Sequence, residues 1–215
     1  GDVILVFDPS RGQQPVRDRL KDFSGTIQTD AYDVYEALRK RQPGLQRIGC
    51  LAHSRRRFYA AARDNLTDAV WFITQIRRLY QIEEEIRDLP PEERYRIRQG
   101  RAPAVWHALK AKAEELKTRY LPQSTLGNAV RYFTNEYEAL TGYLRDGRFE
   151  IDNNLVENAI RPTAVGRRRW LFIGHPDAGW RSAVLYSIIG SCRRRAINPQ
   201  EYLTDILGRL PTAKA

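Results

Sequence analysis

The chain has 215 residues, 42% of them hydrophobic and 29% charged, which is enough to bury a sizeable core in a globular protein. It has no apolar run of the roughly 18 residues that span a bilayer, no leader with a cleavage site and only two cysteines, which argues against a membrane protein or a disulfide scaffold and predicts a soluble intracellular protein. The 36 Lys and Arg against 26 Asp and Glu give a net charge of +10, which favours a polyanionic partner such as nucleic acid, although solvated helix faces explain the same excess.

Short strand-like and helical segments alternate over the first part of the chain. Val3–Phe7 is a β-branched apolar run that predicts a buried strand with a turn after it. A short helix is predicted from Pro15, a second strand over Thr26–Asp30 and a helix over Ala31–Arg41. Another short apolar stretch, Gln46–His53, then leads into a basic segment. This alternation is typical of an α/β domain.

The middle of the chain, from about residue 59 to residue 147, shows only helical patterns. Over Leu66–Leu89 the apolar residues, Val70 among them, follow a three-and-four repeat, which predicts an internal helix-packing seam rather than a dimerising coiled coil. The Pro90–Pro91 pair should end this helix, and Ser124 is the expected N-cap of a later one. An all-helical block is therefore predicted here.

Mixed patterns return in the last third. Glu150–Pro162 predicts a helix that Asn154 caps and the proline stops. Arg169–Gly174 is strand-like, and the final helix should have Asn198 as its cap and Pro199 at its first position. The whole pattern predicts one α/β core that a helical insertion interrupts.

Two acidic residues each admit two interpretations. Asp30 is either the N-cap of the next helix or a carboxylate at the C-terminal end of a core strand, where open α/β sheets place ligand sites. Glu157 stands three residues after Asn154, which suits a capping box, and this role is compatible with binding a metal ion. Arg161, four residues further on, suits an ion pair with Glu157. If the fold brings the two carboxylates together, they suit Mg²⁺, which takes hard oxygen ligands.

Five ordered motifs resemble those of bacterial transposases of the insertion sequence 66 type. They are TIQTDAYDVY (26–35), GCLAHSRRRF (49–58), IDNNLVENAIRP (151–162), GRRRWLFIG (166–174) and YSIIGSCRRRAINPQEYLTDIL (186–207). The resemblance covers essentially the whole chain and implies the C-terminal part of the catalytic region of an Asp-Asp-Glu transposase. The implied fold class is α/β, a ribonuclease H-like core without its first strands, formed by residues 1–58 and 148–215 and interrupted by an all-helical insertion over 59–147.

The resemblance also implies a site and partners. Asp30 would be the second catalytic aspartate and Glu157 the catalytic glutamate, and both would bind Mg²⁺ or Mn²⁺. The partners would be DNA at the transposon ends and the target, further copies of the chain on that DNA, and helper proteins, in the bacterial cytoplasm at the nucleoid. The residues expected to contact DNA are His53, Arg55, Arg56, Asn154, Arg161, Arg167, Arg168 and Arg169.

The basic segment after His53 has a second interpretation, which the sequence favours as much as DNA contact. In it, Cys50 and Phe58 face the core, and the arginines lie in solvent without a partner role. Cys50 and His53 have the spacing of a zinc half-site, but no nearby second pair completes one.

The first catalytic aspartate is where the chain departs from the family pattern. In the family it lies on a strand before the one that Val3–Phe7 resembles, so two of three metal ligands are expected here. Asp8 is a weaker substitute, because its surroundings resemble the turn after a later strand. We therefore predict a DNA transposase catalytic-core fragment for phosphodiester cleavage and strand transfer, inactive alone if the third ligand is missing. The alternative is a non-catalytic DNA-binding or assembly remnant of a transposase.

Overall fold

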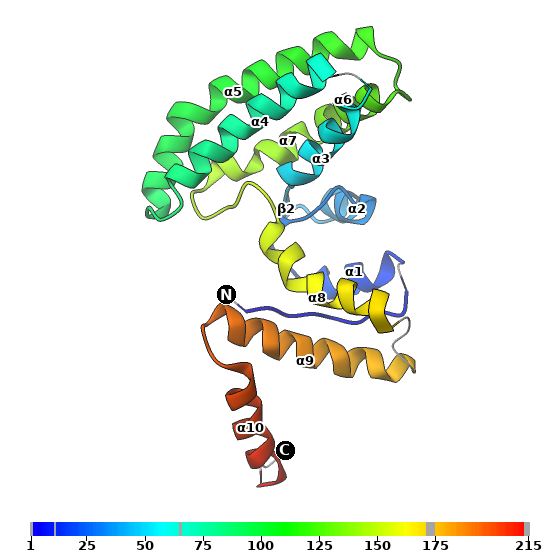
Figure 1. Ribbon diagram of the computed structural model, residues 1–215, viewed down its shortest axis with the longest axis vertical. Helices are drawn as coiled ribbons and strands as arrows, with labels where there is room; N and C mark the ends of the chain where they lie inside the picture. The colour runs from blue at the N-terminus through cyan, green and yellow to red at the C-terminus, as the bar shows by residue number, and fades with distance from the viewer. Residues whose placement is uncertain (1, 11, 65, 171–174, 213–215) are drawn as a thin grey trace. The chain divides into compact units, whose positions relative to one another are not determined.

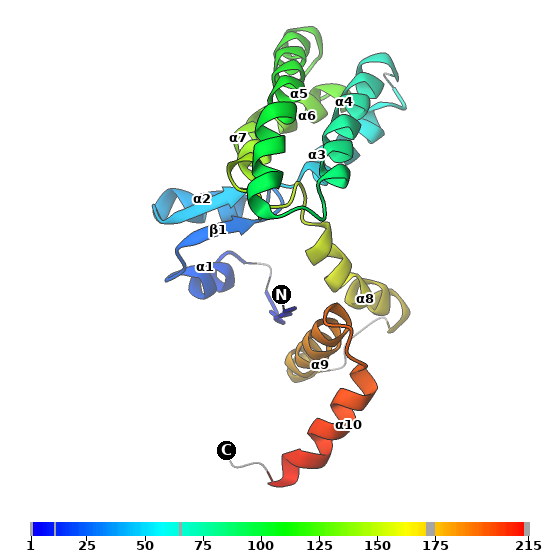
Figure 2. The ribbon, with the colours of Figure 1, turned by 90° about the vertical axis from the view of Figure 1, so that its left-hand side faces the viewer.

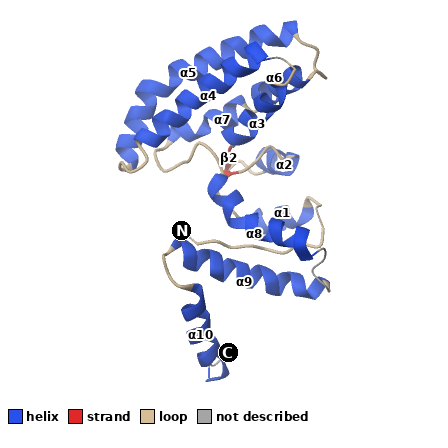
Figure 3. Ribbon diagram, in the orientation of Figure 1, coloured by secondary structure: helices blue, strands red, loops and turns tan. Residues whose placement is uncertain are grey.

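Helices make up most of the protein in a computed structural model that describes residues 2–10, 12–64, 66–170 and 175–212 (Figure 1, Figure 3). The elements are α1 (Gln14–Leu20), β1 (Gly25–Gln28), α2 (Asp33–Arg41), β2 (Leu45–Ile48), α3 (Leu51–Ala61), α4 (Leu66–Glu85), α5 (Pro91–Arg119), α6 (Thr125–Asn135), α7 (Tyr137–Leu140), η1 (Thr141–Arg145), α8 (Asn154–Trp170), α9 (Pro176–Arg194), α10 (Pro199–Arg209) and η2 (Leu210–Thr212). None of the described helices combines the length and the apolar character that crossing a membrane requires.

The chain divides into two compact units. The central unit is Arg19–Asn153, and the terminal unit combines Gly1–Asp18 with Asn154–Ala215. The central unit therefore holds both the strands and the helical block, and the predicted boundary after residue 58 falls within α3. The assignment of 1–58 and 148–215 to a ribonuclease H-like core, with 59–147 as its insertion, stays a prediction.

The two strands of the central unit, β1 and β2, pair in parallel. Gly25 lies opposite Leu45 and Gln28 lies opposite Ile48. Helix α2 supplies the crossover that a parallel pair needs, and Figure 2 shows it beside β1. Gly25 starts the strand with φ at 135°, a conformation that favours glycine, and its N–H donates to the carbonyl of Gly44 at 2.9 Å. Because the two strands are parallel, the segments that follow them leave from the same end of the sheet, its C-terminal edge.

An aromatic core holds the helical block together. Four helices, α3 to α6, supply one buried ring each: Phe58, Phe72, Trp106 and Phe133. Phe58 stacks on Phe72 with the ring centroids 4.2 Å apart, and Trp106 stacks on Phe133 at 6.1 Å. Burying each such side chain is worth about 1.5–3 kcal/mol, so this cluster fixes the packing of the four helices.

In the terminal unit, the first residues run along α9 (Figure 1). The N–H groups of Val3 and Leu5 donate to the hydroxyls of Ser191 and Ser187, at 3.0 and 2.8 Å. Val3 also packs closely on Gly190, where a Cβ would come within 3.2 Å of the valine side chain. Serine hydroxyls therefore satisfy backbone groups that a neighbouring strand would satisfy in a sheet.

Two predictions about these elements are wrong, and a third lies mostly outside the described residues. Val3–Phe7 forms no strand, because its backbone bonds to the α9 serines instead of to a partner strand. Helix α8 continues through Pro162 and ends at Trp170, so Arg169, the predicted start of a strand, is helical, whereas residues 171–174 of that strand lie outside the described part of the chain. A proline weakens one turn without preventing helix on both sides of it, and α5 passes through Pro103 in the same way.

The predicted seam of α4 is confirmed in part. Ile76, Ile82 and Ile86 are buried as predicted, whereas Val70 is 41% exposed and the buried Phe72 and Leu79 lie outside the predicted repeat. The helix itself and its neighbours were predictable: the described residues between 59 and 147 contain helices and connections only, and α5 begins at Pro91.

Candidate active site at the strand ends

Asp30 lies half-buried in the turn that follows β1. Its Oδ1 accepts the backbone N–H of Tyr32 at 3.3 Å. Helix α2 begins only at Asp33, with Tyr32 as its N-cap, so the interpretation of Asp30 as the cap of this helix is wrong. Among the described residues no lysine or arginine forms an ion pair with the Asp30 carboxylate. A half-buried carboxylate of this kind is a suitable ligand for a cation.

The segment Glu150–Asn153 lies across the ends of both strands. The side-chain amide of Gln28, the last residue of β1, donates to the carbonyl of Glu150 at 2.7 Å. The N–H of Leu51, which begins α3 shortly after β2, donates to the carbonyl of Ile151 at 3.2 Å. These bonds hold the segment that leads into α8 at the C-terminal edge of the sheet, where α/β proteins place their ligand sites.

Cys50 packs beneath the same segment. The N–H of Asn153 points to its Sγ at 3.5 Å, and the residue is 1% exposed. Burial raises the pKa of the Cys50 thiol, which keeps it protonated. The zinc interpretation of Cys50 and His53 therefore stays as the sequence left it, a half-site without a second pair.

Helix α3 has one face toward the core and a basic face on the other side. Phe58 is fully buried, as Cys50 is, so the core-facing interpretation of these two residues is confirmed. Arg56 is exposed on the opposite side, and the guanidinium of Arg55 lies 5.1 Å from the ring centroid of Tyr80. The two interpretations of the segment are therefore compatible, and contact of His53, Arg55 and Arg56 with DNA stays a prediction.

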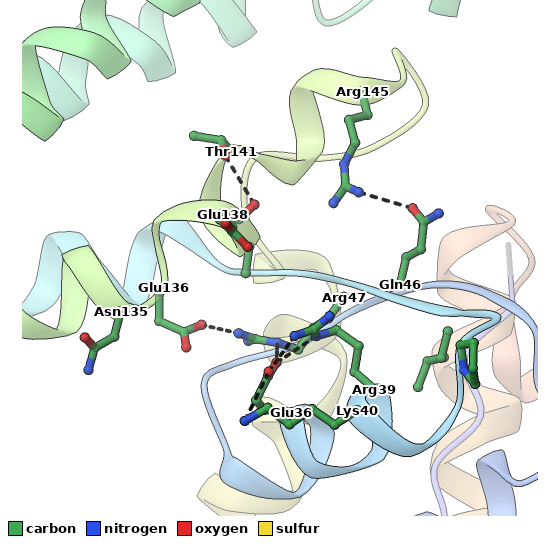
Figure 4. Close-up of a pocket in the computed structure, with 13 residues that line it drawn as sticks. Glu36, Arg39, Lys40, Gln46, Arg47, Asn135, Glu136, Glu138, Thr141 and Arg145 are labelled. Atoms are coloured by element: carbon green, nitrogen blue, oxygen red, sulfur yellow. Dashed lines mark hydrogen bonds and ion pairs between the residues drawn. The ribbon is translucent and has the colours of Figure 1, made fainter.

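A polar pocket of about 730 Å³ lies between α2, β2 and the α6–η1 region (Figure 4). Its deepest cation is Arg47, whose Nη2 lies 2.6 Å from Oε2 of Glu136 and whose Nε lies 3.5 Å from Oε2 of Glu36. Nη1 of the same guanidinium donates to the backbone carbonyl of Asp30 at 3.4 Å. Arg47 therefore braces the turn that carries Asp30, and the acids of the pocket neutralise it.

Glu157 lies in the first turn of α8 and is half-buried. The helix begins at Asn154 itself, one residue before the predicted start, so the capping box stays a prediction. Asn154 and Arg161 are exposed. Of the other residues expected to contact DNA, Arg169 is exposed, and the side chains of Arg167 and Arg168 lie outside the described part of the structure.

Asp30 belongs to the central unit and Glu157 to the terminal unit, so their binding of one ion stays a prediction. Asp8 belongs to the terminal unit and accepts the N–H of Ser10 at 2.9 Å in a turn. Carboxylate oxygens match the ligand preference of Mg²⁺ and Mn²⁺, so the donor set of Asp30 and Glu157 fits the expected cofactor.

A protein-family model described as "Transposase IS66 family" matches residues 2–181, a range that includes Asp30 and Glu157. The chain belongs to the IS66 transposase family. This IS66 chain is 32% identical over 214 residues to the uncharacterized protein y4jD of Sinorhizobium fredii (strain NBRC 101917 / NGR234), which covers 97% of the chain and 42% of that protein. It is 32% identical over 218 residues to the uncharacterized protein y4qI of the same strain, covering 97% of the chain and 40% of that protein.

The IS66 chain thus spans about two fifths of the length of these curated relatives. No solved structure matches it.

Three residues that organise this part of the IS66 chain were not identified from the sequence: Gln28, Arg47 and Tyr80. Each acts on a residue far along the chain, as Gln28 does on Glu150, 122 residues later. Local patterns report local structure, so no spacing rule could have found these contacts. The one available hint was the position of Gln28 at the end of an apolar strand, two residues before Asp30.

Proposed function

We propose that this chain is part of the catalytic region of a DNA transposase, in which Asp30 and Glu157 bind a divalent metal ion for phosphodiester cleavage and strand transfer at transposon ends. The observation that carries the proposal is the IS66 family match over residues 2–181, which contains both acids in the expected order. Because the curated relatives are more than twice as long, the proposal concerns a part of the transposase machinery.

The contacts within the central unit support the proposed pairing of the two acids. Glu150–Asn153 is bonded to the edge of the sheet from which the Asp30 turn leaves. Glu157 follows three residues after the first residue of α8, which is a rise of about 5 Å along a helix. The chain path therefore limits how far Glu157 can lie from that edge.

The metal would be Mg²⁺ or Mn²⁺, with Asp30 and Glu157 as protein ligands. When bound, such ions activate a hydroxyl nucleophile and stabilise the leaving oxygen of the phosphodiester. The protein's part is to hold the carboxylates: Arg47 holds the backbone of Asp30, and Gln28 holds the segment before α8.

DNA is the proposed substrate, in keeping with the net charge of +10. The basic face of α3 with Arg55 and Arg56, and Arg161 of α8, would contact phosphates. Binding through such contacts weakens steeply as the salt concentration rises, because bound counterions are released.

The test is a cleavage and strand-joining assay on the full chain, with DNA that carries the ends of its own element and with Mg²⁺ or Mn²⁺. Wild type should cut and join this DNA only with metal. Asp30→Asn and Glu157→Gln should each lower the rate at least about a hundredfold, since loss of even a supporting partner of a metal ligand costs about 10- to 100-fold.

Matched controls are Asp33→Asn, an exposed acid at the start of α2, and Glu201→Gln in the first turn of α10. Both should keep the wild-type rate. DNA binding without cleavage, together with metal binding by calorimetry that Asp30→Asn and Glu157→Gln leave unchanged, would refute the enzymatic proposal and favour the alternative, a non-catalytic DNA-binding or assembly remnant.

A further inference from the structure

The helical block touches the segment before α8 through Tyr80 of α4. The Tyr80 hydroxyl donates to Oδ2 of Asp152 at 2.7 Å. Burial first, and then the negative charge of Asp152, raise the pKa of Tyr80, so its hydroxyl stays a donor over the whole working pH range. The guanidinium of Arg55 lies 5.1 Å from the ring centroid on the same side chain. Tyr80 is thus held between α3 and the segment that leads to Glu157.

Helix α5 holds the same segment from its other end. Arg94 donates through both of its terminal nitrogens to Oε1 of Glu150, at 3.2 Å each. Arg98, which is fully buried, binds Glu83 of α4 with its Nε at 2.9 Å and its Nη2 at 2.5 Å from the two carboxylate oxygens. This bidentate pair fixes the direction of the guanidinium.

The remaining donors of Arg98 point at the loop just before Glu150. They reach the carbonyls of Asp146 at 2.9 Å and Phe149 at 2.8 Å. Gly147 lies so close to the start of α5 that a Cβ there would be 1.7 Å from the carbonyl oxygen of Pro91. Helix α5 therefore fixes the loop before Glu150 by backbone contact and by charge, and Tyr80 of α4 holds the segment after it at Asp152.

We propose that helices α4 and α5 are a clamp that positions Glu150–Asn153 at the strand ends, and through it the first turn of α8, with Tyr80 as the positioning residue. Only the expected effect of the clamp on activity rests on the proposed function. The clamp gives the helical block a role in the active site, in addition to its role as a folded insertion.

The experiment compares Tyr80→Phe with Tyr120→Phe in the full chain. Both changes remove one hydroxyl that donates to an aspartate, since Tyr120 donates to Oδ2 of Asp68 at 2.8 Å. In Tyr80→Phe, amide hydrogen exchange in a peptide covering 150–153 should speed up about tenfold, the expected effect of losing a hydrogen bond to a charged group. Tyr120→Phe should leave exchange there unchanged.

Substitutions of the acceptor separate positioning from other roles of Asp152. Asp152→Asn keeps an oxygen that accepts the hydrogen bond from the Tyr80 hydroxyl, so amide hydrogen exchange over 150–153 should stay near the wild-type rate. Asp152→Ala should speed up this exchange at least as much as Tyr80→Phe does. If the chain cleaves DNA, Tyr80→Phe should lower kcat about tenfold and leave KM for DNA unchanged, because the change alters only the placement of Glu157 and not the contacts with DNA.

Equal exchange over 150–153 in the two tyrosine variants would overturn the clamp. Metal binding that Asp30→Asn and Glu157→Gln leave unchanged, together with the exchange difference, would refute the proposed function and leave the clamp supported. A lower kcat in Tyr120→Phe that equals that of Tyr80→Phe would show a general loss of stability and would also overturn it.

Discussion

At the scale of single residues, the thiol of Cys50 reports directly on the packing of the segment before α8. Asn153 covers its Sγ, and Cys50 is 1% exposed. Burial raises the pKa of this thiol, so less of it is thiolate at pH 8 than in a free cysteine, and thiol reagents attack the thiolate. Slow modification of Cys50 therefore means that the segment is in place.

We predict that, in the folded chain at pH 8, a disulfide reagent modifies Cys50 at least about a hundredfold more slowly than free cysteine, which corresponds to a local opening free energy of about 3 kcal/mol. Cys192 is 4% exposed and should also react slowly, whereas both thiols should react at once in denaturant. A rapidly modified thiol that is present in wild type and absent in Cys50→Ser would contradict this packing.

Single residues were also where the sequence was most informative. The Ser124 hydroxyl accepts the N–H of Gly127 at 3.1 Å, and Asn198 accepts the N–H of Gln200 at 3.0 Å, so both predicted caps are confirmed. Pro199 opens α10, also as predicted. Caps depend on residues two or three positions apart, and for that reason they can be read from a sequence.

At the scale of elements, the buried pair of Arg98 and Glu83 joins α5 to α4. The side chain of Arg98 is fully buried and that of Glu83 is 9% exposed. On the same helix, Arg101 pairs with Glu85 at the surface, where the two side chains are 47% and 57% exposed. The two pairs differ in burial, and they allow a matched comparison of what a buried pair contributes.

Arg98→Ala should lower the free energy of unfolding by about 3–5 kcal/mol, because it leaves the Glu83 carboxylate buried and uncompensated. Arg101→Ala should cost less than about 1 kcal/mol, as solvent screens an exposed pair. Urea unfolding of both variants, followed by circular dichroism, measures the difference. Equal losses would mean that Arg98 does not hold the loop as described.

The elements themselves were predictable in type more than in extent. A prediction made from the proline alone ended α8 at Pro162, whereas the helix continues to Trp170. The apolar run Val3–Phe7 has strand composition, but its backbone bonds to serines of α9, 182 to 188 residues away in the sequence. The composition of a segment sets its preference for a β-strand, but a strand forms only if the fold supplies a neighbouring strand to pair with it.

At the scale of the whole molecule, the site depends on contacts that no periodicity reveals. Asp30 and Glu157 could be named from motifs, and Asp30 does follow a strand at the edge of a parallel pair. The bonds from Gln28 to Glu150 and from Tyr80 to Asp152 join residues 122 and 72 positions apart. Long-range contacts of this kind depend on how the elements pack in the fold, which local sequence signals do not specify.

The proposed function requires that Asp30 and Glu157 bind the same divalent ion. Iron-directed cleavage of the full chain tests it most directly. Fe²⁺ in place of Mg²⁺, with ascorbate and peroxide, produces radicals that cut the backbone beside the bound ion. If both acids bind one ion, two sets of fragments should appear, ending near residues 30 and 157, both suppressed by excess Mg²⁺ and both lost in Asp30→Asn. Cutting near only one of the two acids, or cuts near 157 that persist in Asp30→Asn, would contradict it.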